Sequence, residues 1–116
     1  MANQELLDAL RNDPAEFKRI RAQDPKAELD LTGADLAGCD LTGANLAGAT
    51  LRNACLRGSD CTGINLRFAD LSGADVRDVR LAEANLHQSV LAGADLEGST
   101  LGDIEGRTRI CLHPDV

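Results

Sequence analysis

The stretch LDLTG-ADLAG-CDLTG-ANLAG, residues 29–48, decides the fold because it begins a five-residue pattern that continues without insertion to residue 103. Fifteen consecutive units result, and the fifth residue is Gly in nine of them. The third residue is Leu except at Cys61 and Val76, the first is mostly Ala or another small residue, and the second is usually Asp or Asn. A fixed internal period is the strongest architectural signal that one sequence can carry. The pattern predicts a solenoid.

The spacing of the apolar residues indicates that the chain coils. The first and third residues of a unit are two apart, a strand-like spacing that puts both side chains on one face. The next apolar residue follows three positions later, so a corner must separate the units. Gly at the fifth position supplies the positive φ that a type II turn needs at its second central residue. We expect corners without Gly to use a different turn type, since other residues resist positive φ. These corners are Asn53, Phe68, Asp78, Glu83, Gln88 and Asp103.

Identical residues recur twenty positions apart, which favours four units per coil. Asn45, Asn65 and Asn85 form one such series, and stacking would let their side-chain amides form a ladder. A second series consists of Ala34, Ala54, Ala74 and Ala94. A spacing of ten also fits the alternation of Thr and Ala at the fourth positions of residues 32–47. The residues alone therefore leave the number of units per coil open.

Five units match the motif A-(D/N)-L-x-x closely, and they begin at Ala34, Ala44, Ala69, Ala84 and Ala94. In this motif and its uninterrupted repetition, the sequence resembles the pentapeptide repeat family. The resemblance implies an all-β solenoid, a right-handed quadrilateral β-helix with four units per coil. Fifteen units divided by four give about 3.75 coils. At roughly 4.8 Å per coil, the stack is about 18 Å long.

The third-position leucines are expected to fill the axis of this solenoid, each contributing about 1.5–3 kcal/mol. Cys61 and Val76 underfill the column. Ile64 and Val79 are larger than the usual first-position Ala and stand three residues after them. We expect the larger residues to compensate for the smaller ones.

Residues 1–28 lack the period and are predicted to form an N-terminal helical cap, followed by the repeat domain of residues 29–103. Asn3 is expected to cap a first short helix. The apolar side of this helix carries Leu6, Leu7 and Leu10. Short amphipathic helices cannot bury their apolar faces alone. The open end of the solenoid is the surface available to them.

A second helix is predicted after the break at Asp13. Asp13 is a good N-cap residue, Pro14 suits the first helical position, and Glu16 stands at the capping-box spacing. Phe17 and Ile20 form the apolar stripe. We interpret both as packing residues of the cap.

Residues 104–116 leave the pattern and are predicted to form a short C-terminal lid. Its apolar residues are Ile104, Ile110, Cys111 and Leu112. The ends of a solenoid need covering, because open edges invite pairing with another chain. The same segment could instead pair two molecules. We therefore expect a monomer or an end-to-end homodimer through the C-terminal segment.

The composition excludes several partner classes. The 116-residue chain has a net charge of −7, with 19 Asp and Glu against 12 Lys and Arg. This charge argues against direct binding to nucleic acid or to an anionic membrane. No apolar run approaches the roughly 20 residues of a membrane span, and no secretory signal is visible. Four cysteines without close pairing suit a reducing compartment, so we expect a cytoplasmic protein.

Residues that could carry catalysis are scattered. His87 and His113 have no Cys or His partner at metal-ligand spacing. Cys39 and Cys61 fall on inward positions, and the inward serines have no base in register. The sequence predicts no enzyme, no catalytic residue, no metal and no cofactor.

The exterior remains for function, and its most regular feature is the acidic second position. Either these carboxylates bond nearby backbone and satisfy the coil, or they form a regular row of negative charge for a partner. Two arginines are expected to stack on one side with Glu97 next and to interrupt that row. The candidate interaction surface consists of Asp30, Asp35, Asp40, Asp60, Asp70, Asp75 and Asp95, with Arg57 and Arg77.

The sequence therefore predicts an acidic, non-catalytic solenoid that binds an unidentified protein. The resemblance implies an alternative, because some pentapeptide repeat proteins resemble B-DNA and bind type II topoisomerases. In this alternative the chain is a DNA-mimicking inhibitor or protector of DNA gyrase. Those topoisomerase binders are longer solenoids with projecting loops, whereas no loop interrupts the units here.

Overall fold

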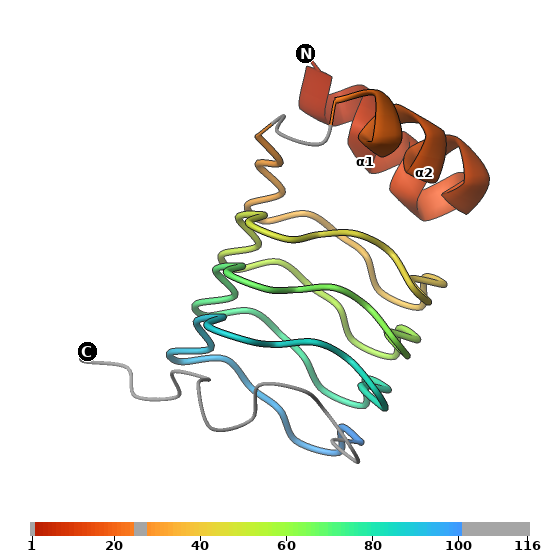
Figure 1. Ribbon diagram of the computed structural model, residues 1–116. Helices are drawn as coiled ribbons and strands as arrows, with labels where there is room; N and C mark the ends of the chain where they lie inside the picture. Colours follow the sequence, from red (N-terminus) through yellow and green to blue (C-terminus); the bar gives the residue numbers. More distant parts are fainter. Residues whose placement is uncertain (1, 25–27, 101–116) are drawn as a thin grey trace.

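The chain folds into two helices followed by a β-helical solenoid. The computed structural model describes residues 2–24 and 28–100, with the backbone alone for residues 2–4. Helices α1 (Ala2–Asn12) and α2 (Pro14–Gln23) lie at one end of the stacked coils (Figure 1). The solenoid is a right-handed quadrilateral β-helix, as predicted. The predicted lid over residues 104–116, and with it the end-to-end homodimer, lies outside the described residues.

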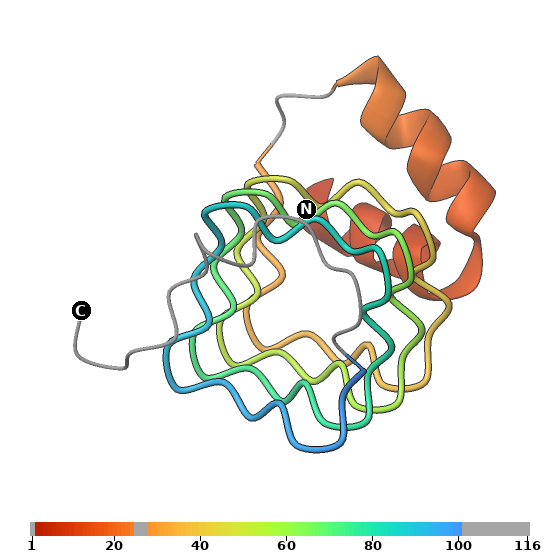
Figure 2. The same cartoon turned by 60° about the horizontal axis from the view of Figure 1, so that its bottom comes forward.

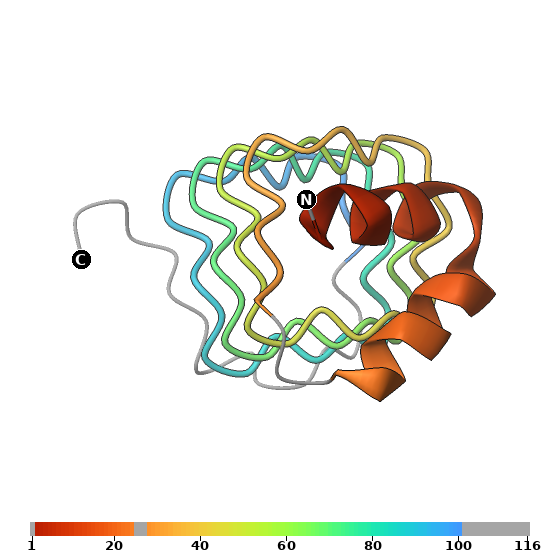
Figure 3. The same cartoon turned by 90° about the horizontal axis from the view of Figure 1, so that it is seen from above.

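Each coil contains twenty residues, which settles the spacing that the sequence left open. Every second-position residue from Asp30 to Arg80 forms a parallel bridge to the residue twenty positions on, as in Asp30 with Thr50 and Arg80 with Thr100. Leu31 N–H donates to Thr50 O at 2.7 Å, and Thr50 N–H donates to Leu29 O at 2.8 Å. Figures 2 and 3, which look along the stack, show the four sides of each coil. Four units per coil are therefore confirmed, and a ten-residue spacing is wrong.

Each corner is a tight turn with positive φ at the fifth position of the unit. Gly33 has φ +71°, and Ala34 N–H donates to Leu31 O at 3.0 Å, which closes the turn. The corners without Gly also have positive φ, between 58° and 61°. These corners are Asn53, Phe68, Asp78, Glu83 and Gln88. The prediction that they use another turn type is wrong, whereas the predicted corner at Asp103 lies outside the described residues.

The coil explains why residues with a side chain accept this backbone strain. Asn53 N–H donates to Ser72 O in the next coil at 3.0 Å, and Ala54 N–H donates to Leu51 O at 3.0 Å. The corners at Gly33 and Gly58 make the same pair of bonds. A left-handed conformation costs an L-residue about 1–2 kcal/mol. The hydrogen bonds of the surrounding coils hold the backbone in this conformation despite that cost.

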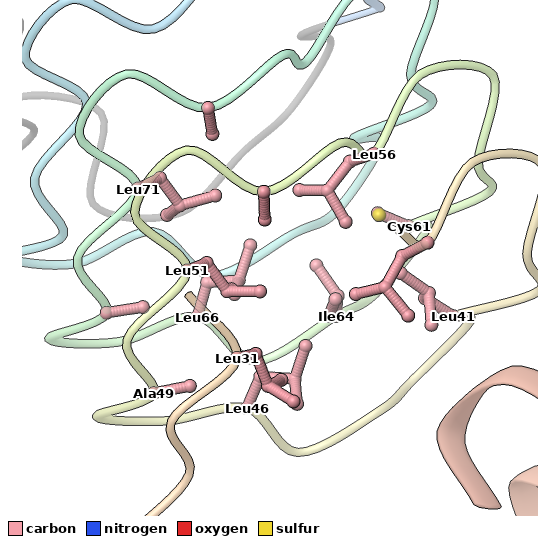
Figure 4. Close-up of a cluster of buried hydrophobic side chains, with 14 of the residues drawn as sticks. Leu31, Leu41, Leu46, Ala49, Leu51, Leu56, Cys61, Ile64, Leu66 and Leu71 are labelled. Carbon is pink, nitrogen blue, oxygen red and sulfur yellow. The ribbon is translucent and has the colours of Figure 1, made fainter. Parts of the chain in front are cut away.

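The axis of the solenoid is filled by the predicted third-position side chains (Figure 4). Leu36, Leu46 and Leu51 are fully buried, with 0% exposure. The smaller Cys61 and the larger Ile64 both point into this interior, and each is 1% exposed. Both belong to the same buried cluster, and the expected compensation between underfilled and overfilled positions stays a prediction. Among the described residues, every buried side-chain nitrogen or oxygen has a hydrogen-bond partner.

Helix α1 lies across the open end of the first coil (Figure 3). Its Leu6 and Leu10 belong to the same buried cluster as the solenoid leucines. The helix begins at Ala2, so the prediction that Asn3 caps it is wrong. Asn3 lies inside the first turn, because the helix starts two residues earlier than it would with Asn3 as its N-cap. The boundaries proposed at residues 28 and 103 remain predictions.

Helix α2 begins as predicted but without a full capping box. Asp13 Oδ1 accepts a bond from Glu16 N–H at 3.2 Å, and Pro14 occupies the first helical position. Asp13 N–H already donates to Ala9 O at 2.7 Å, so it is not free for the Glu16 carboxylate. That carboxylate pairs instead with Arg19. Phe17 is 2% exposed, which agrees with a packing role.

One buried arginine ties α2 to the solenoid. Arg21 is 6% exposed, and its guanidinium donates to Asn45 O at 3.1 Å and to Ala47 O at 2.9 Å. Burial lowers the pKa of Arg21, and the nearby Asp24 offsets part of this effect. The sequence analysis gave Arg21 no role, because its partners are main-chain carbonyl groups of a unit far along the chain.

Candidate interaction surface

The twenty-residue register sorts the outward side chains onto four faces. The acidic face consists of units 34–38, 54–58, 74–78 and 94–98, and the asparagine face consists of units 44–48, 64–68 and 84–88. Five of the predicted surface residues share the acidic face, namely Asp35, Asp75, Asp95, Arg57 and Arg77. The others divide between the two remaining faces: Asp30 and Asp70 lie on one, and Asp40 and Asp60 lie on the other. The candidate residues therefore do not form a single surface.

All seven second-position aspartates bond to nearby backbone. In each, Oδ1 accepts a hydrogen bond from the main-chain N–H two residues on, at 3.0–3.2 Å. The pairs run from Asp30 with Thr32 to Asp95 with Glu97. This local bond agrees with the first of the two interpretations, in which the carboxylates bond nearby backbone and satisfy the coil. One oxygen of each carboxylate is therefore committed to the coil, and Oδ2 is the atom left to meet other groups.

Hydroxyl groups reinforce several of these bonds. Thr32 Oγ1 donates to Asp30 Oδ1, and Thr62 Oγ1 donates to Asp60 Oδ1, both at 2.7 Å. These hydroxyl bonds are the main cause that lowers the pKa of Asp30 and of Asp60. At Asp70, burial raises the pKa, but bonds from Ser72 and Arg52 outweigh it and lower the pKa overall.

Arginine neutralises the centre of the acidic face. Arg77 Nε and Nη2 donate to the two oxygens of Asp75, each at 2.8 Å, and Nε lies 3.9 Å from Asp95 Oδ2. The side-chain bonds from Arg77 lower the pKa of Asp75 to about 2. Arg57 Nε lies 3.8 Å from Asp78 Oδ2. The expected interruption of the acidic row is present, and it includes bonds that tie the carboxylates to the molecule itself.

The asparagine face carries the predicted amide column. Asn45, Asn65 and Asn85 each accept a bond through Oδ1 from the N–H two residues on, at 3.1–3.2 Å. Asn65 Nδ2 also donates to Asn45 Oδ1, at 3.4 Å. The predicted ladder thus has one long rung between these two residues, and the backbone bonds are the shorter ones.

An exposed aromatic cluster stands at the edge of the asparagine face, and the sequence analysis missed it. Phe68 is 53% exposed and has φ +61°. The guanidinium carbon of Arg67 lies 5.4 Å from the centre of the Phe68 ring. The His87 ring meets that ring edge-on, with centroids 6.2 Å apart and an interplanar angle of 86°. We call Arg67, Phe68 and His87 the Phe68 cluster. The available signal was an aromatic residue at a corner where Gly is usual.

A groove of about 500 Å³ lies between α2 and the first coil. Its lining includes Phe17, Lys18, Arg21, Asp40 and Ala44. Arg21 is already committed to main-chain carbonyl groups, so the groove offers Lys18 and Asp40 as its remaining charged side chains. This composition does not single out a ligand.

The described residues can be searched for a metal-binding cluster and for a reactive thiol. In residues 2–24 and 28–100, no group of three or more His, Cys, Asp or Glu is placed to hold a metal ion. Burial raises the pKa of the Cys61 thiol to about 11, which disfavours the reactive thiolate. Neither described helix has the length and apolar character needed to cross a membrane.

Comparisons with known proteins agree with this architecture. The sequence profile for pentapeptide repeats (8 copies) matches residues 27–63 and 59–98. The crystal structure of alr5209, a pentapeptide repeat protein from Nostoc PCC 7120, is 30% identical over 96% of this chain and 93% of that chain, with a TM-score of 0.65. No curated protein sequence matches the chain significantly.

Two further structures are similar at a lower level. HetL, a pentapeptide repeat protein involved in heterocyst differentiation regulation from Nostoc sp. strain PCC 7120, is 34% identical over 75% of this chain and 41% of that chain, with a TM-score of 0.42. QnrB1, a plasmid-mediated fluoroquinolone resistance protein, is 17% identical over 69% of this chain and 64% of that chain, with a TM-score of 0.35.

The fold and its outer faces define a class of protein, the four-sided β-helical solenoids with a core of stacked leucines. The family profile matches residues 27–63 and 59–98, which is more than half of the chain. The chain belongs to the pentapeptide repeat family.

Proposed function

We propose that the chain is a non-catalytic solenoid that binds another protein through its outer faces. The observation that carries this proposal is the filled interior. Within the described coils, inward positions hold aliphatic side chains such as Leu36 and Leu46, which are fully buried, so protein side chains occupy the axis where a small molecule would have to bind. The outward side chains stand in columns at regular steps along the solenoid. Repeat proteins of this one-dimensional kind present extended surfaces, and such surfaces suit a protein partner.

Affinity capture with face-specific variants tests the proposal. Each variant changes one outward fourth-position arginine to Ala, namely Arg52, Arg57 or Arg67, which lie on three different faces. A genuine partner is captured by the parent chain from extract of the source cell, and one of the three variants loses it by about tenfold, as expected for an interface hot spot. The proposal is contradicted if the parent chain captures no protein in greater amount than a variant that carries all three changes.

DNA mimicry directed at a type II topoisomerase is the alternative function. Residues 29–100 carry ten carboxylates against five arginines, an excess that favours a basic groove as the binding site. The Arg77 clamp on Asp75 and the contact between Arg57 and Asp78 reduce the resemblance to a row of phosphates. A supercoiling assay with purified DNA gyrase separates the two functions. Inhibition or protection of the gyrase at micromolar concentrations of the chain supports DNA mimicry. The absence of both effects rules it out.

A further inference from the structure

We propose that the Phe68 cluster docks an acidic segment of the partner protein, one that pairs carboxylates with an apolar side chain. The inference rests on the proposed function and names the chemistry of its partner. The polarity is the opposite of what the net charge of −7 suggests, because the whole chain favours a basic partner. The local arrangement of charge and apolar surface leads to this conclusion.

Phe68 combines exposure with an unfavourable backbone. It is the one large hydrophobic side chain that is exposed in the described part of the chain, at 53%. Its φ of +61° is uncommon for a bulky residue, and nine other described corners carry Gly with similar φ. A Gly at residue 68 would remove both the strain and the exposed ring. Four other described corners without Gly have the same positive φ, so the exposure of its ring, and not the strain, sets Phe68 apart.

Its neighbours hold the ring in a defined orientation. Arg67 lies 5.4 Å from the ring centroid, within the range of a cation–π contact, and His87 meets the ring edge-on. An aromatic ring held by a guanidinium loses little conformational freedom when a partner binds. Phe and Arg are both enriched in protein interfaces relative to the rest of the surface.

The charge of the surrounding face selects a carboxylate. Units 44–48, 64–68 and 84–88 contain no Asp or Glu, whereas each of the other three faces carries at least two. Within the described residues Arg67 makes no ion pair, whereas Arg52 and Arg77 each contact a carboxylate. A carboxylate that approaches Arg67 therefore finds an uncommitted guanidinium and no acidic residue on the same face.

The two requirements identify the occupant. The exposed face of Phe68 favours an apolar or aromatic side chain, and the adjacent Arg67 favours Asp or Glu beside it. The amide column next to the cluster offers polar groups to the main chain of the same segment. An extended acidic segment with interspersed apolar residues meets all three conditions, whereas a basic segment would place its charge against Arg67.

A random library of twelve-residue peptides displayed on phage, selected on the full chain, tests this inference. We expect the selected peptides to combine Asp or Glu with an adjacent aliphatic or aromatic residue. Their affinity should fall about tenfold or more for Phe68→Gly and for Arg67→Ala. The matched controls are Asn53→Gly, which relieves the same strain on another face, and Arg52→Ala. Both controls should bind within about twofold of the parent chain.

The Gly variants separate folding from binding. Phe68→Gly and Asn53→Gly both place Gly at a positive-φ corner, so each should melt at or above the temperature of the parent chain. Selection of basic peptides, failure to select any peptide, or equal binding to Phe68→Gly overturns the inference. Self-association of the parent chain that Phe68→Gly abolishes overturns it as well, because a second copy is then the occupant. A cellular partner that all Phe68 and Arg67 variants still capture removes this inference but leaves the proposed function standing.

Discussion

The acidic face and the asparagine face are built from the same five-residue unit, but they differ in how much of their polar chemistry is available. On the acidic face, Asp75 has one oxygen bonded to backbone and both oxygens held by Arg77. On the asparagine face, Arg67 has no carboxylate partner within the described residues and lies against the exposed Phe68 ring. The density of charge along a face therefore does not measure how much of it a partner can reach.

The corner residues of the two faces also differ in the groups that their side chains contact. The acidic face turns at Gly38, Gly58, Asp78 and Gly98, whereas the asparagine face turns at Gly48, Phe68 and Gln88. At Asp78 the side chain occupies the space beside the next corner, since a Cβ added at Gly98 would overlap Asp78 Oδ1. The Phe68 ring instead lies against Arg67 and His87 on its own face. Both side chains are largely exposed, but the Asp78 carboxylate lies beside the next corner and near Arg57, whereas Phe68 presents an apolar ring.

The largest expected effect concerns the attachment of the helical cap to the asparagine face. Arg21→Met keeps much of the aliphatic stem but removes the guanidinium that bonds to Asn45 O and Ala47 O. Hydrogen bonds from charged groups contribute about 1.5–3 kcal/mol each, so we expect a loss of about 3 kcal/mol. Chemical denaturation measures this loss. Hydrogen exchange of the α2 amides should accelerate more than exchange in the coils, because the cap loosens first.

Lys18→Met is the matched control for this change. Lys18 lies on the same helix and is exposed, so its replacement should alter stability by less than about 0.5 kcal/mol. Unchanged exchange of α2 in Arg21→Met would mean that packing of Leu10 and Phe17 alone attaches the cap. The asparagine face would then have no special part in holding α2.

We expect opposite changes in stability when a corner Gly of the acidic face is replaced and when the corner Phe68 of the asparagine face becomes Gly. Gly58→Ala on the acidic face adds a Cβ that meets no heavy atom within 4 Å, so its cost is the backbone strain alone, about 1 kcal/mol. Phe68→Gly on the asparagine face removes that strain. After the greater chain entropy of Gly is subtracted, it should gain about 0.5–1 kcal/mol. Urea denaturation of both variants gives the two values.

Gly98→Ala extends this comparison of corners, because its added Cβ would also overlap Asp78 Oδ1. It should therefore cost more than Gly58→Ala, and the double variant with Asp78→Gly should recover the excess. A loss of stability in Phe68→Gly would show that the ring stabilises the fold. The expectation that Gly relieves strain at this corner would then fail.

The leucine column and the corners illustrate what the sequence could and could not predict. The inward side chains were predictable, since Leu36 and Leu46 repeat at a fixed step and burial dominates the energetics of the fold. The corner at Asn53 was mispredicted, because local propensity opposes positive φ while bonds to the next coil impose it. Those bonds join residues that are nineteen positions apart, and no local rule contains them.

The candidate site divides in the same way. The backbone bonds of Asp75 and the other second-position aspartates followed from a local preference and could be expected. The Phe68 cluster could not, because His87 reaches Phe68 only through the twenty-residue register. A column-wise alignment of the units places residues 67, 68 and 87 together, and it would have revealed the cluster once four units per coil were fixed.

A smaller effect should appear in acid on the acidic face. The pKa of Asp75 is lowered from 3.8 to about 2 by Arg77, so this group stabilises the fold above pH 3.8. The contribution is lost as the pH falls from 3.8 to 2, because the native carboxylate must then take up a proton. Asp75→Asn keeps the acceptor for Arg77 N–H but lacks the titrating charge. Its melting temperature should therefore fall less than that of the parent chain between pH 5 and pH 2.5.

Asp35→Asn is the control for this titration. Asp35 makes the same backbone bond on the same face, at 3.2 Å, but within the described residues no arginine clamps it. If both variants show the same acid dependence, the arginine clamp does not bind Asp75 more firmly than water does. The acidic face would then be more available to a partner than its geometry indicates.

The smallest expected effect comes from giving the asparagine face a carboxylate of its own. Asn65→Asp keeps the Oδ1 acceptor for Arg67 N–H but removes the Nδ2 donor to Asn45 Oδ1, a bond of 3.4 Å at the limit of hydrogen bonding. We expect a loss of about 0.5 kcal/mol by urea denaturation, the lower end for one hydrogen bond. Asn85→Asp, for which the described residues show no amide–amide bond, is the control. A loss above about 1.5 kcal/mol at residue 65 alone would mean that the amide column holds the coils together. The absence of acidic residues from this face would then have a structural cause, and the uncommitted Arg67 would be its by-product.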